Sequence, residues 1–427
     1  MRTVVSKIIV NPSECKKQLL SWSNQFREVI FLDSNDYLQT YSNYDCLLAV
    51  DAFTSIKTDF EKAFEDLHQY QTQTKDWLFG YLSYDLKNDI EDLHSTNYDG
   101  LEFPDLYFFQ PKKLFLLKGN QLEIQYLNLC DDEIDADFDA IMTSQKTAHS
   151  QLHVEIRQRI SKENYLSKVN TLLEHIQRGD IYEANFCMEF YADNAIIDPL
   201  KVFQKLNAIS EPPFAVYFKN NNHFLLSASP ERYLKKENTT VISQPIKGTA
   251  SRFDDQEADE KSKNELSKNQ KERSENIMIV DLVRNDLSHT ATKGSVEVEE
   301  LCKIYTFKQV HQMISTIVSN VAPNTAPIEL LRTTFPMGSM TGAPKISAMN
   351  IIENLEETKR GLYSGAVGYF TPGGDFDFNV VIRSILYNAS KHYVSFSVGS
   401  AITSLSEPSK EYEECLLKAK AMFEVLS

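Results

Sequence analysis

Short apolar runs separated by polar turns fill the first 130 residues of this chain. Residues 29–32, 77–81 and 113–117 are examples, and each run is rich in aromatic or branched aliphatic side chains. Runs this short favour β-strands, because a helix needs a longer periodic pattern to bury one face. This part of the chain is therefore predicted to be rich in strands.

Helical spacing appears after residue 160 and alternates with further strands. In residues 164–177 apolar side chains recur every three or four positions, between Ser161 and Gly179, which are typical of a helix start and a helix end. The other expected helices cover 256–287, a segment beginning near Pro344, and 410–425. Strands are expected at 365–370, 376–386 and 393–402. The pattern by itself predicts a mixed α/β chain.

A change of composition divides the chain near residue 131. Residues 131–153 are rich in acidic and small polar side chains and poor in apolar ones, which is typical of a surface linker. We therefore expect a β-rich N-terminal subdomain over residues 1–130 and a larger second domain over residues 154–427.

The excess of acidic residues limits the partners of the chain. Its 427 residues carry a formal net charge of −16, which argues against nucleic acid or an anionic membrane as the main partner. No stretch approaches the ~20 apolar residues of a membrane span, and residues 1–7 lack the apolar core of a signal peptide. The six scattered cysteines fit reduced thiols. We expect a cytoplasmic protein.

A lysine and a glutamate stand out in the middle of the chain. Residues 223–227 are predicted to form a strand, 235–238 a polar turn and 239–242 the returning strand, which would bring Glu231 and Lys247 to one rim. A lysine becomes nucleophilic when desolvation or a cationic neighbour lowers its pKa and a carboxylate handles protons. The pair is a candidate nucleophile and acid–base. The alternative is an exposed lysine and an acid in a turn.

Two pairs of glutamates recur at helical spacing. Glu272 and Glu275 stand three residues apart ahead of an apolar run, and Glu411 and Glu414 repeat the spacing on the last expected helix. Acids at this spacing share one helical face, and two such pairs can converge on one Mg²⁺ ion. Singly, each pair would more often be a solvated helix face.

Two further segments have the character of anion sites. Residues 338–345 are mostly small and lead into a helix, whose unpaired N–H groups can bind an anion, unless the segment is a plain turn. Arg383 shares one face of the expected strand with Asp377 and Asn379, so it can hold a carboxylate or pair with Asp377. Lys418 lies on the same helical side as Glu414 and can bind substrate or pair with that acid.

In these segments the chain resembles the chorismate-utilising enzymes. The resemblance is strong from about residue 161 to the C-terminus and weaker in the first half, through 78–85 and 103–106. The strongly matching segments, in family order, are 229–232 (Ser-Pro-Glu-Arg), 245–249 (Pro-Ile-Lys-Gly-Thr), 275–286, 338–345, 365–369, 382–384 and 411–418. The resemblance implies an α/β fold in which two antiparallel sheets form a sandwich with helices outside. Residues 154–427 would be the chorismate-binding catalytic domain.

One position separates the branches of this family. Relatives that make anthranilate carry alanine where this chain has Lys247, whereas relatives that make aminodeoxychorismate carry lysine. The resemblance implies that Lys247 attacks C2 of chorismate and displaces the C4 hydroxyl, with Glu231 as the acid that assists its departure. Ammonia then adds at C4 and expels the lysine, giving 4-amino-4-deoxychorismate for 4-aminobenzoate and folate synthesis.

The resemblance also implies how the substrate is held. Mg²⁺ bound by Glu275 and Glu414, with Glu272 and Glu411 supporting it through water, would hold the ring carboxylate. The residues expected to contact the rest of the substrate are Arg383, Tyr363, Gly399, Lys418, Thr341, Gly342 and Thr249.

The chain departs from the family pattern at three places. Relatives have three glycines where this chain has Gly399, Ser400 and Ala401, and the two added side chains restrict the backbone of the expected anion site. Glu183 stands where this branch often has glutamine and the water-adding relatives have lysine, so water addition is disfavoured. Gln312 stands where the anthranilate-forming relatives have histidine.

The source of ammonia is expected to be another protein. No cysteine stands in a Gly-x-Cys-x-Gly turn, so we expect a separate glutamine amidotransferase subunit. Two alternatives remain for the function. The chain can be an anthranilate synthase component I, which Lys247 disfavours, or a non-catalytic paralogue that binds a metabolite, which the retained Lys247, Glu231 and glutamate pairs disfavour.

Overall fold

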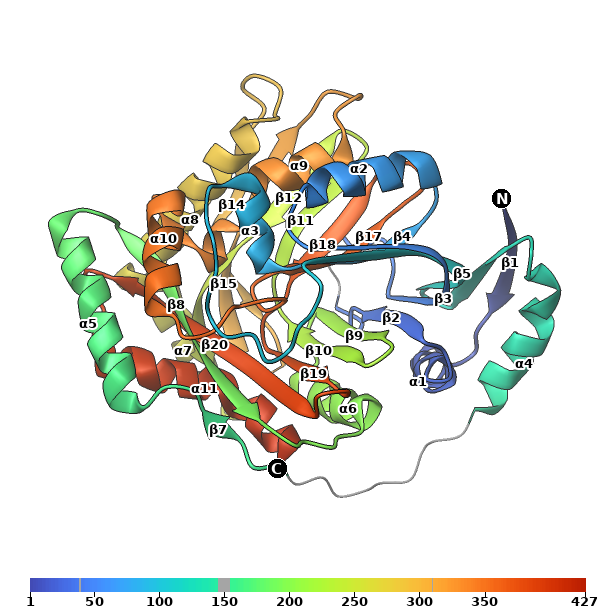
Figure 1. Cartoon of the computed structure of the whole chain (residues 1–427), viewed down its shortest axis with the longest axis horizontal. Helices are drawn as coiled ribbons and strands as arrows, with labels where there is room; N and C mark the ends of the chain where they lie inside the picture. The colour runs from blue at the N-terminus through green and yellow to red at the C-terminus, as the bar shows by residue number, and fades with distance from the viewer. Residues whose placement is uncertain (38–39, 145–153, 309) are drawn as a thin grey trace.

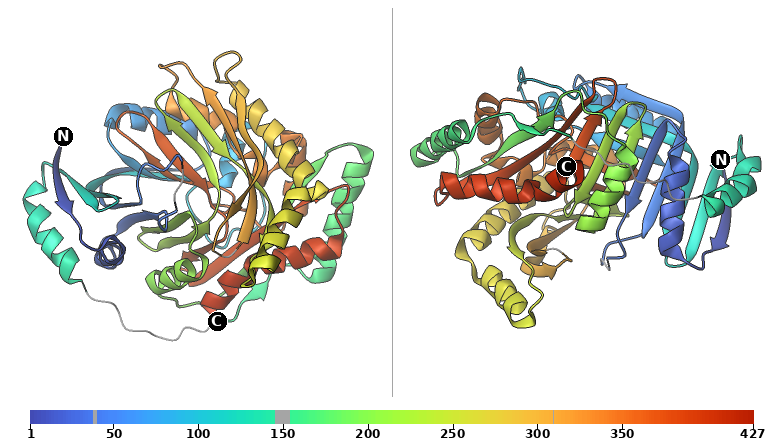
Figure 2. Two further views of the ribbon diagram at one scale, coloured as in Figure 1. Left: turned by 180° about the vertical axis from the view of Figure 1, so that it is seen from behind. Right: turned by 90° about the horizontal axis from the view of Figure 1, so that it is seen from below.

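Two antiparallel sheets pack face to face, with helices on their outer faces (Figures 1 and 2). The structure is a computed structural model that describes residues 1–37, 40–144, 154–308 and 310–427. The fold class expected from the sequence is confirmed. No helix of the described residues is long and apolar enough to cross a membrane.

The first sheet runs from the N-terminal strand to the strand that carries Glu183. Its strands, in spatial order, are β1 (Arg2–Ile8), β6 (Gln121–Leu127), β5 (Leu106–Lys118), β3 (Cys46–Thr58), β2 (Glu28–Asp33), β9 (Phe214–Asn220), β10 (His223–Ser229), β19 (Ser384–Asn388), β20 (Tyr393–Thr403) and β8 (Glu183–Ala192). Two short strands, β7 (Arg157–Gln158) and β16 (Gly342–Ala343), also pair with β8.

The second sheet begins at the first half of β5. Its other strands follow in the order β4 (Leu78–Leu82), β17 (Ala366–Phe370), β18 (Phe376–Val380), β11 (Arg232–Glu237), β12 (Thr240–Gln244) and β15 (Val310–Asn320). The strands β13 (Ile246–Ser251) and β14 (Glu297–Thr306) also pair with β15. Since β5 belongs to both sheets, it joins them along one side.

The alternation of side chains along each strand builds the core between the sheets. In β4, Phe79 and Tyr81 point into the cluster between the sheets, whereas Leu78 and Leu82 belong to the cluster on the outer face. Successive side chains of a strand point to opposite faces, so a continuous apolar run fills both layers. This explains why the short runs of the N-terminal region carry no polar alternation.

Helices cover the two outer faces. On the first sheet these are α1 (Pro12–Ser23), α4 (Ile134–Thr143), α5 (Lys162–Arg178), α6 (Pro199–Ser210), α10 (Lys345–Leu355) and α11 (Pro408–Leu426). On the second sheet they are α2 (Ala63–Thr74), α8 (Gln270–Ser288) and α9 (Pro327–Thr334). The short α3 (Lys87–Ile90) and the polar α7 (Gln256–Lys268) complete the set of the described residues.

Most helices lie where the sequence placed them, but the long helix expected over residues 256–287 is wrong. The chain breaks at Asn269, and the Asn269 side chain accepts a hydrogen bond from the Glu272 backbone N–H. An asparagine cap of this kind starts a new helix rather than continuing an old one. Glu272 and Glu275 therefore sit in the first turns of α8, as a separate helix.

The hairpin expected over residues 223–242 is also wrong. Strand β10 pairs with β9 and β19, whereas the returning strand β12 pairs with β11, and Asn238 at φ 55° makes the turn. Lys235 and Lys236, which were expected in a turn, belong to β11. Both residues pair with β12 on one side and with β18 on the other.

The expected linker is partly helical. Residues 134–143 form α4, whose Ile134 and Ile141 are buried in the cluster beneath the first sheet. Residues 145–153 lie outside the described residues. Strands from both sides of this segment share both sheets, since β2 pairs with β9 and β4 pairs with β17. The composition change at residue 131 thus separates two stretches of sequence that build common sheets.

Candidate active site

Two crossovers between the sheets bring Glu231 and Arg383 to the same end of the sandwich. The chain passes from β10 to β11 through Glu231, and returns from β18 to β19 through Arg383. Backbone hydrogen bonds join the two crossovers. The Val380 N–H donates to the Glu231 carbonyl at 3.0 Å, and the Ala228 N–H donates to the Arg383 carbonyl at 3.1 Å. These backbone hydrogen bonds fix the positions of Glu231 and Arg383 where the chain crosses between the two sheets.

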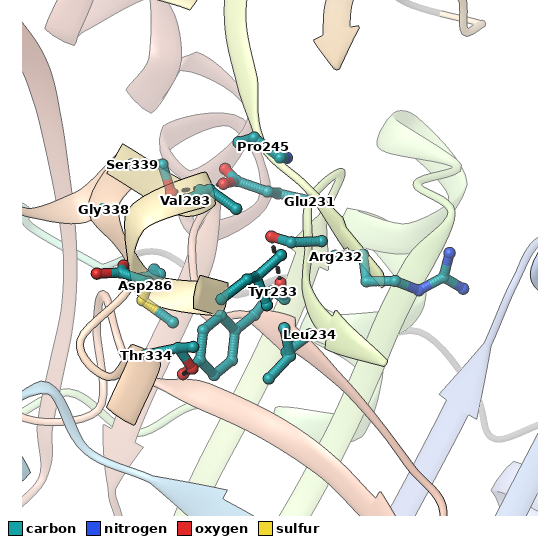
Figure 3. Close-up of a pocket in the computed structure, with 13 residues that line it drawn as sticks. Glu231, Arg232, Tyr233, Leu234, Pro245, Val283, Asp286, Thr334, Gly338 and Ser339 are labelled. Carbon is teal, nitrogen blue, oxygen red and sulfur yellow. Dashed lines mark hydrogen bonds between the residues drawn. The ribbon is translucent and has the colours of Figure 1, made fainter. Parts of the chain in front are cut away.

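Glu231 is a buried acid that holds its proton to a higher pH than an exposed glutamate does. It is 3% exposed, and its Oε1 accepts a hydrogen bond from the Ser339 hydroxyl at 2.6 Å (Figure 3). Burial raises the pKa of Glu231 to about 7, against the opposing effects of Ser339 and of the Lys247 charge. A carboxyl group with such a pKa can donate a proton to a leaving group at physiological pH.

Lys247 lies on β13 with its amine inside the protein. The Nζ atom donates to Oε1 of Glu183 at 2.9 Å, and the two side chains are 10% and 1% exposed. Burial alone would lower the pKa of Lys247, but the charges of Glu183, Glu275 and Glu231 outweigh it, and the pKa is raised. The resting state therefore does not have the lowered lysine pKa that activates a nucleophile, because Glu183 and Glu275, distant in sequence, act on the amine together with Glu231.

Glu183 contacts Lys247 but was not among the site residues expected from the sequence. It appeared there only as a departure from the family pattern, and nothing linked it to a lysine 64 positions away. Glu183 is the first residue of β8, between β16 and β20. The one available signal was the acid itself, at a position where the branch often carries glutamine.

Arg383 does not share a strand face with Asp377 and Asn379, so that expectation is wrong. The strand ends at Val380, and Arg383 has φ 52° in the crossover that follows. Asp377 instead pairs with Arg232 at 2.9 Å, which also excludes the alternative ion pair.

The guanidinium of Arg383 is available for an external anion. It is half-buried, and no hydrogen bond or ion pair joins it to any other residue that the structure describes. Burial lowers the pKa of Arg383, with Tyr363 and Glu414 acting in the opposite direction. A cation held in this way is suited to bind a carboxylate.

Three of the remaining candidate residues, Lys418, Tyr363 and Gly399, contact other parts of the protein. Lys418 is used internally, since its Nζ donates to the Gly399 carbonyl at 2.9 Å and pairs with Glu414 at 2.6 Å. Tyr363 is buried beside Cys187, whose thiol lies 3.9 Å from the Tyr363 hydroxyl. A side chain at Gly399 would come within 2.6 Å of the Cys187 sulfur, so glycine is required there for packing.

Thr341 and Gly342 tie the segment 338–345 to the strand that carries Glu183. Gly342 pairs with Ala184, and a Cβ at Gly342 would lie only 2.2 Å from the Glu183 carbonyl oxygen. The buried Thr341 hydroxyl donates to the Gly338 carbonyl at 3.2 Å. Thr249 is exposed on β13, and the structure shows no side-chain hydrogen bond from it to a described residue.

Gln312 lies next to these groups on β15. It is buried opposite Thr249, and its side-chain oxygen has no hydrogen-bond partner among the described residues. The adjacent His311 is occupied elsewhere, with Nε2 at 3.0 Å from Asp259 and Nδ1 at 3.0 Å from Thr306.

The four glutamates of α8 and α11 face each other across the site. Lys271 lies between them, with Nζ at 3.0 Å from Glu411 and 3.8 Å from Glu275. Burial raises the pKa of Glu275 to about 7. Burial and the charge of Glu414 raise the pKa of Glu272.

These acids fit a divalent cation by their chemistry. One buried carboxylate oxygen of Glu275 and one of Glu411 have no hydrogen-bond partner among the described residues, which is unfavourable unless another group satisfies them. Within residues 1–37, 40–144, 154–308 and 310–427 no three such side chains are already gathered around one point. One oxygen each of Glu275 on α8 and Glu411 on α11 is therefore free to bind a cation. Lys271 is the positive charge that lies beside both glutamates.

Comparison with known proteins identifies the family. Residues 18–424 match the family of chorismate binding enzymes. This chain belongs to that family. The match covers every strand of the two sheets except β1 and every candidate site residue, and the resemblance drawn from the sequence is confirmed.

Curated relatives come from two branches of the chorismate-binding family. An anthranilate synthase component I-like protein of Synechocystis is 34% identical over 82% of this chain and 72% of its own length. The aminodeoxychorismate synthase component 1 of Bacillus subtilis is 30% identical over 80% of this chain and 75% of its own. The chain spans only 30% and 28% of two plant aminodeoxychorismate synthases that it also matches.

A solved structure shares the fold. Anthranilate synthase component I of Streptococcus pneumoniae superposes with a TM-score of 0.77 over 91% of this chain and 94% of its own, at 23% identity. At this identity the likeness concerns the fold alone, so the branch has to be decided from the site.

Proposed function

We propose that this chain is an aminodeoxychorismate synthase component I, which converts chorismate and ammonia to 4-amino-4-deoxychorismate. The observation that carries the proposal is the buried Lys247 amine in a pocket of acids that includes Glu231. The family's anthranilate-forming members carry alanine at this position. The match to the Bacillus subtilis aminodeoxychorismate synthase component 1 supports the same branch.

Lys247 and Glu231 would carry the covalent steps. The Lys247 amine attacks C2 of chorismate, and the two conjugated ring double bonds each shift by one position towards C4. The C4 hydroxyl then leaves as water with the proton of Glu231. The 3% exposure and raised pKa of Glu231 suit this role as an acid. Ammonia then adds at C4 and expels the lysine.

Arg383 would hold the enolpyruvyl carboxylate of the substrate. Its guanidinium lacks an internal partner among the described residues, and it lies near Tyr363. Lys418, Gly399, Thr341, Gly342 and Thr249 would act mainly by shaping the pocket, because the first four are engaged within the protein and Thr249 lies at its exposed edge.

A Mg²⁺ ion would bind between α8 and α11. Glu275 and Glu414 would hold it directly, with Glu272 and Glu411 supporting it through water, and Lys271 would give way. When bound, the ion neutralises the ring carboxylate of chorismate. The open oxygens of Glu275 and Glu411 support this assignment.

Ammonia would come from a separate glutamine amidotransferase subunit in the cytoplasm. A glutaminase needs a reactive thiolate, and all six cysteines are buried. Burial raises the pKa of Cys187 to about 12 and that of Cys15 to about 11, so neither is poised as a nucleophile.

The test is mass spectrometry of the products formed from chorismate, Mg²⁺ and ammonium. We expect aminodeoxychorismate from the unsubstituted chain and from Lys261→Ala, which changes an exposed lysine, but not from Lys247→Ala. Anthranilate as the product would assign the chain to the other branch. Unchanged chorismate under all conditions would favour a non-catalytic paralogue.

A further inference from the structure

Lys247 cannot act as a nucleophile in the protonation state that its surroundings favour. The charged groups that act on it most strongly are Glu183, Glu275 and Glu231, and Lys247 also interacts with Glu272 and Glu414, so all of them are acids. An ammonium has no lone pair, so one proton must leave before a nitrogen–carbon bond forms. The proposed function therefore requires a base close to this amine.

Glu183 is the carboxylate best placed to be that base. Among the described residues it is the one acid that hydrogen bonds to the Lys247 amine, at 2.9 Å. Glu231 instead accepts from Ser339 at 2.6 Å. Glu275 lies closer to another cation, because its Oε1 is 3.8 Å from the Lys271 amine.

The second oxygen of Glu183 is unusual. Oε2 is buried and has no hydrogen-bond partner in the parts of the chain that the structure describes. A carboxylate that is stabilised only through one oxygen is a better base than one with both oxygens satisfied. Transfer of the proton also converts a buried ion pair into two neutral groups, which removes part of its desolvation penalty.

The backbone fixes the position of Glu183 on both sides. It pairs with Ala343 on one side and with Thr403 on the other. Gly342 approaches so closely that a Cβ there would lie 2.2 Å from the Glu183 carbonyl oxygen. A base held by a sheet on two sides keeps its distance to the amine during turnover, which is what proton transfer needs.

We propose that Glu183 is the base that removes a proton from Lys247, an inference that rests on the proposed function. The Lys247 ammonium gives one proton to the Glu183 carboxylate, leaving a neutral amine and a carboxylic acid. The amine lone pair then forms the bond to C2, the two conjugated ring double bonds shift to C1=C6 and C4=C5, and the C4–oxygen bond breaks. The hydroxyl leaves as water with the Glu231 proton.

The return half of the reaction restores both groups. Ammonia forms a bond to C4, both ring double bonds shift back, and the C2–nitrogen bond breaks with its electron pair returning to the Lys247 nitrogen. The amine recovers its proton from Glu183, and the new ammonium group at C4 supplies a proton to Glu231. No oxidant or further reactant is required.

The test combines turnover with the chemical reactivity of Lys247. Glu183→Gln keeps the size of the side chain and a hydrogen-bond acceptor but removes the base. Carbamylation of Lys247 by cyanate in the resting protein, followed by peptide mass spectrometry, reports the fraction of free amine. Glu189→Gln is the matched control, because Glu189 is a buried acid on the same strand that pairs with Arg159 rather than Lys247.

We expect Glu183→Gln to label Lys247 faster and yet turn over more slowly. Labelling rises because each unit by which the pKa of Lys247 falls gives about tenfold more free amine. Turnover, as kcat, falls about 100-fold, the usual loss for a missing general base, with KM for chorismate nearly unchanged. Glu183→Asp should recover part of kcat, and Glu189→Gln should change neither measurement appreciably.

Other outcomes overturn the role of Glu183. Faster labelling with undiminished kcat would mean that another group removes the proton. Slower labelling together with slower turnover would mean that Glu183 only positions the lysine. A failure of the unsubstituted chain to form aminodeoxychorismate would contradict the proposed function itself, and the role of Glu183 would fall with it.

Discussion

Replacing Glu231 by glutamine is expected to abolish turnover and yet to make the protein more stable at alkaline pH. Glu231 is 3% exposed, and burial raises its pKa to about 7 from the ordinary value of 4.5. The folded state therefore holds the proton more tightly than the unfolded state does. Stability that is fully present below pH 4.5 is lost as the pH rises towards 7, where the buried carboxyl ionises.

The size of the effect follows from the shift in pKa. A rise from 4.5 to about 7 corresponds to about 3 kcal/mol of folding free energy lost by the charged form. Glutamine never ionises, and its amide oxygen can still accept from Ser339. By linkage, the gain in Glu231→Gln is under about 1 kcal/mol at pH 5 and about 3 kcal/mol at pH 8.5.

Thermal unfolding at the two pH values measures this difference. With an unfolding entropy of about 0.9 kcal/mol per kelvin for a chain of this length, the variant should melt about 3 °C above the unsubstituted protein at pH 8.5 and about 1 °C above it at pH 5. A constant offset from the changed hydrogen bond cancels between the two measurements. Glu189→Gln should instead lower the melting temperature at pH 8.5, because Arg159 loses its partner. A difference for Glu231→Gln that does not grow with pH would refute the raised pKa.

Three further substitutions probe the rest of the site. Arg383→Met should raise KM for chorismate roughly 10- to 100-fold, the worth of a charged hydrogen bond, while leaving the melting temperature nearly unchanged; an unaltered KM would exclude it from substrate binding. Gly342→Ala should cost more than about 2 kcal/mol in stability, because the new Cβ would clash with the Glu183 carbonyl. Gly373→Ala is the control and should be tolerated, because the one atom near its new Cβ lies 3.8 Å away. Equal melting temperatures for the two variants would contradict the close packing at Gly342. Lys271→Met should lower the melting temperature of the metal-free protein. It should also bind Mn²⁺ more tightly in calorimetry, because no ammonium group competes with the metal for Glu411. An unchanged affinity for Mn²⁺ would show that Lys271 does not occupy the metal's place.

Local features of the fold were well predicted from the sequence. Errors arose where one local pattern is compatible with more than one backbone conformation. The helix ending at Gly179 was predicted because its end requires the left-handed conformation, φ 85°, that glycine adopts readily. The break at Asn269 was missed because an asparagine within a polar run is compatible with either a helix interior or a cap. The expected hairpin failed because turn-like polar residues can also line a strand when neighbouring strands supply its hydrogen bonds.

The sequence by itself determined the chemistry that this protein carries. Three local arrangements of residue types can be read from the chain: Lys247 in its Pro-Ile-Lys-Gly-Thr segment, Glu231 four residues after the apolar run 223–227, and the glutamate pairs on two expected helices. Only the tertiary structure decided how these groups act on each other. The contact of Lys247 with Glu183 and the unpartnered state of Arg383 depend on strands that meet after long separations and on crossovers between sheets. Because charge interactions depend on distance in space and on burial, the state of the lysine could not be read from its neighbours in sequence.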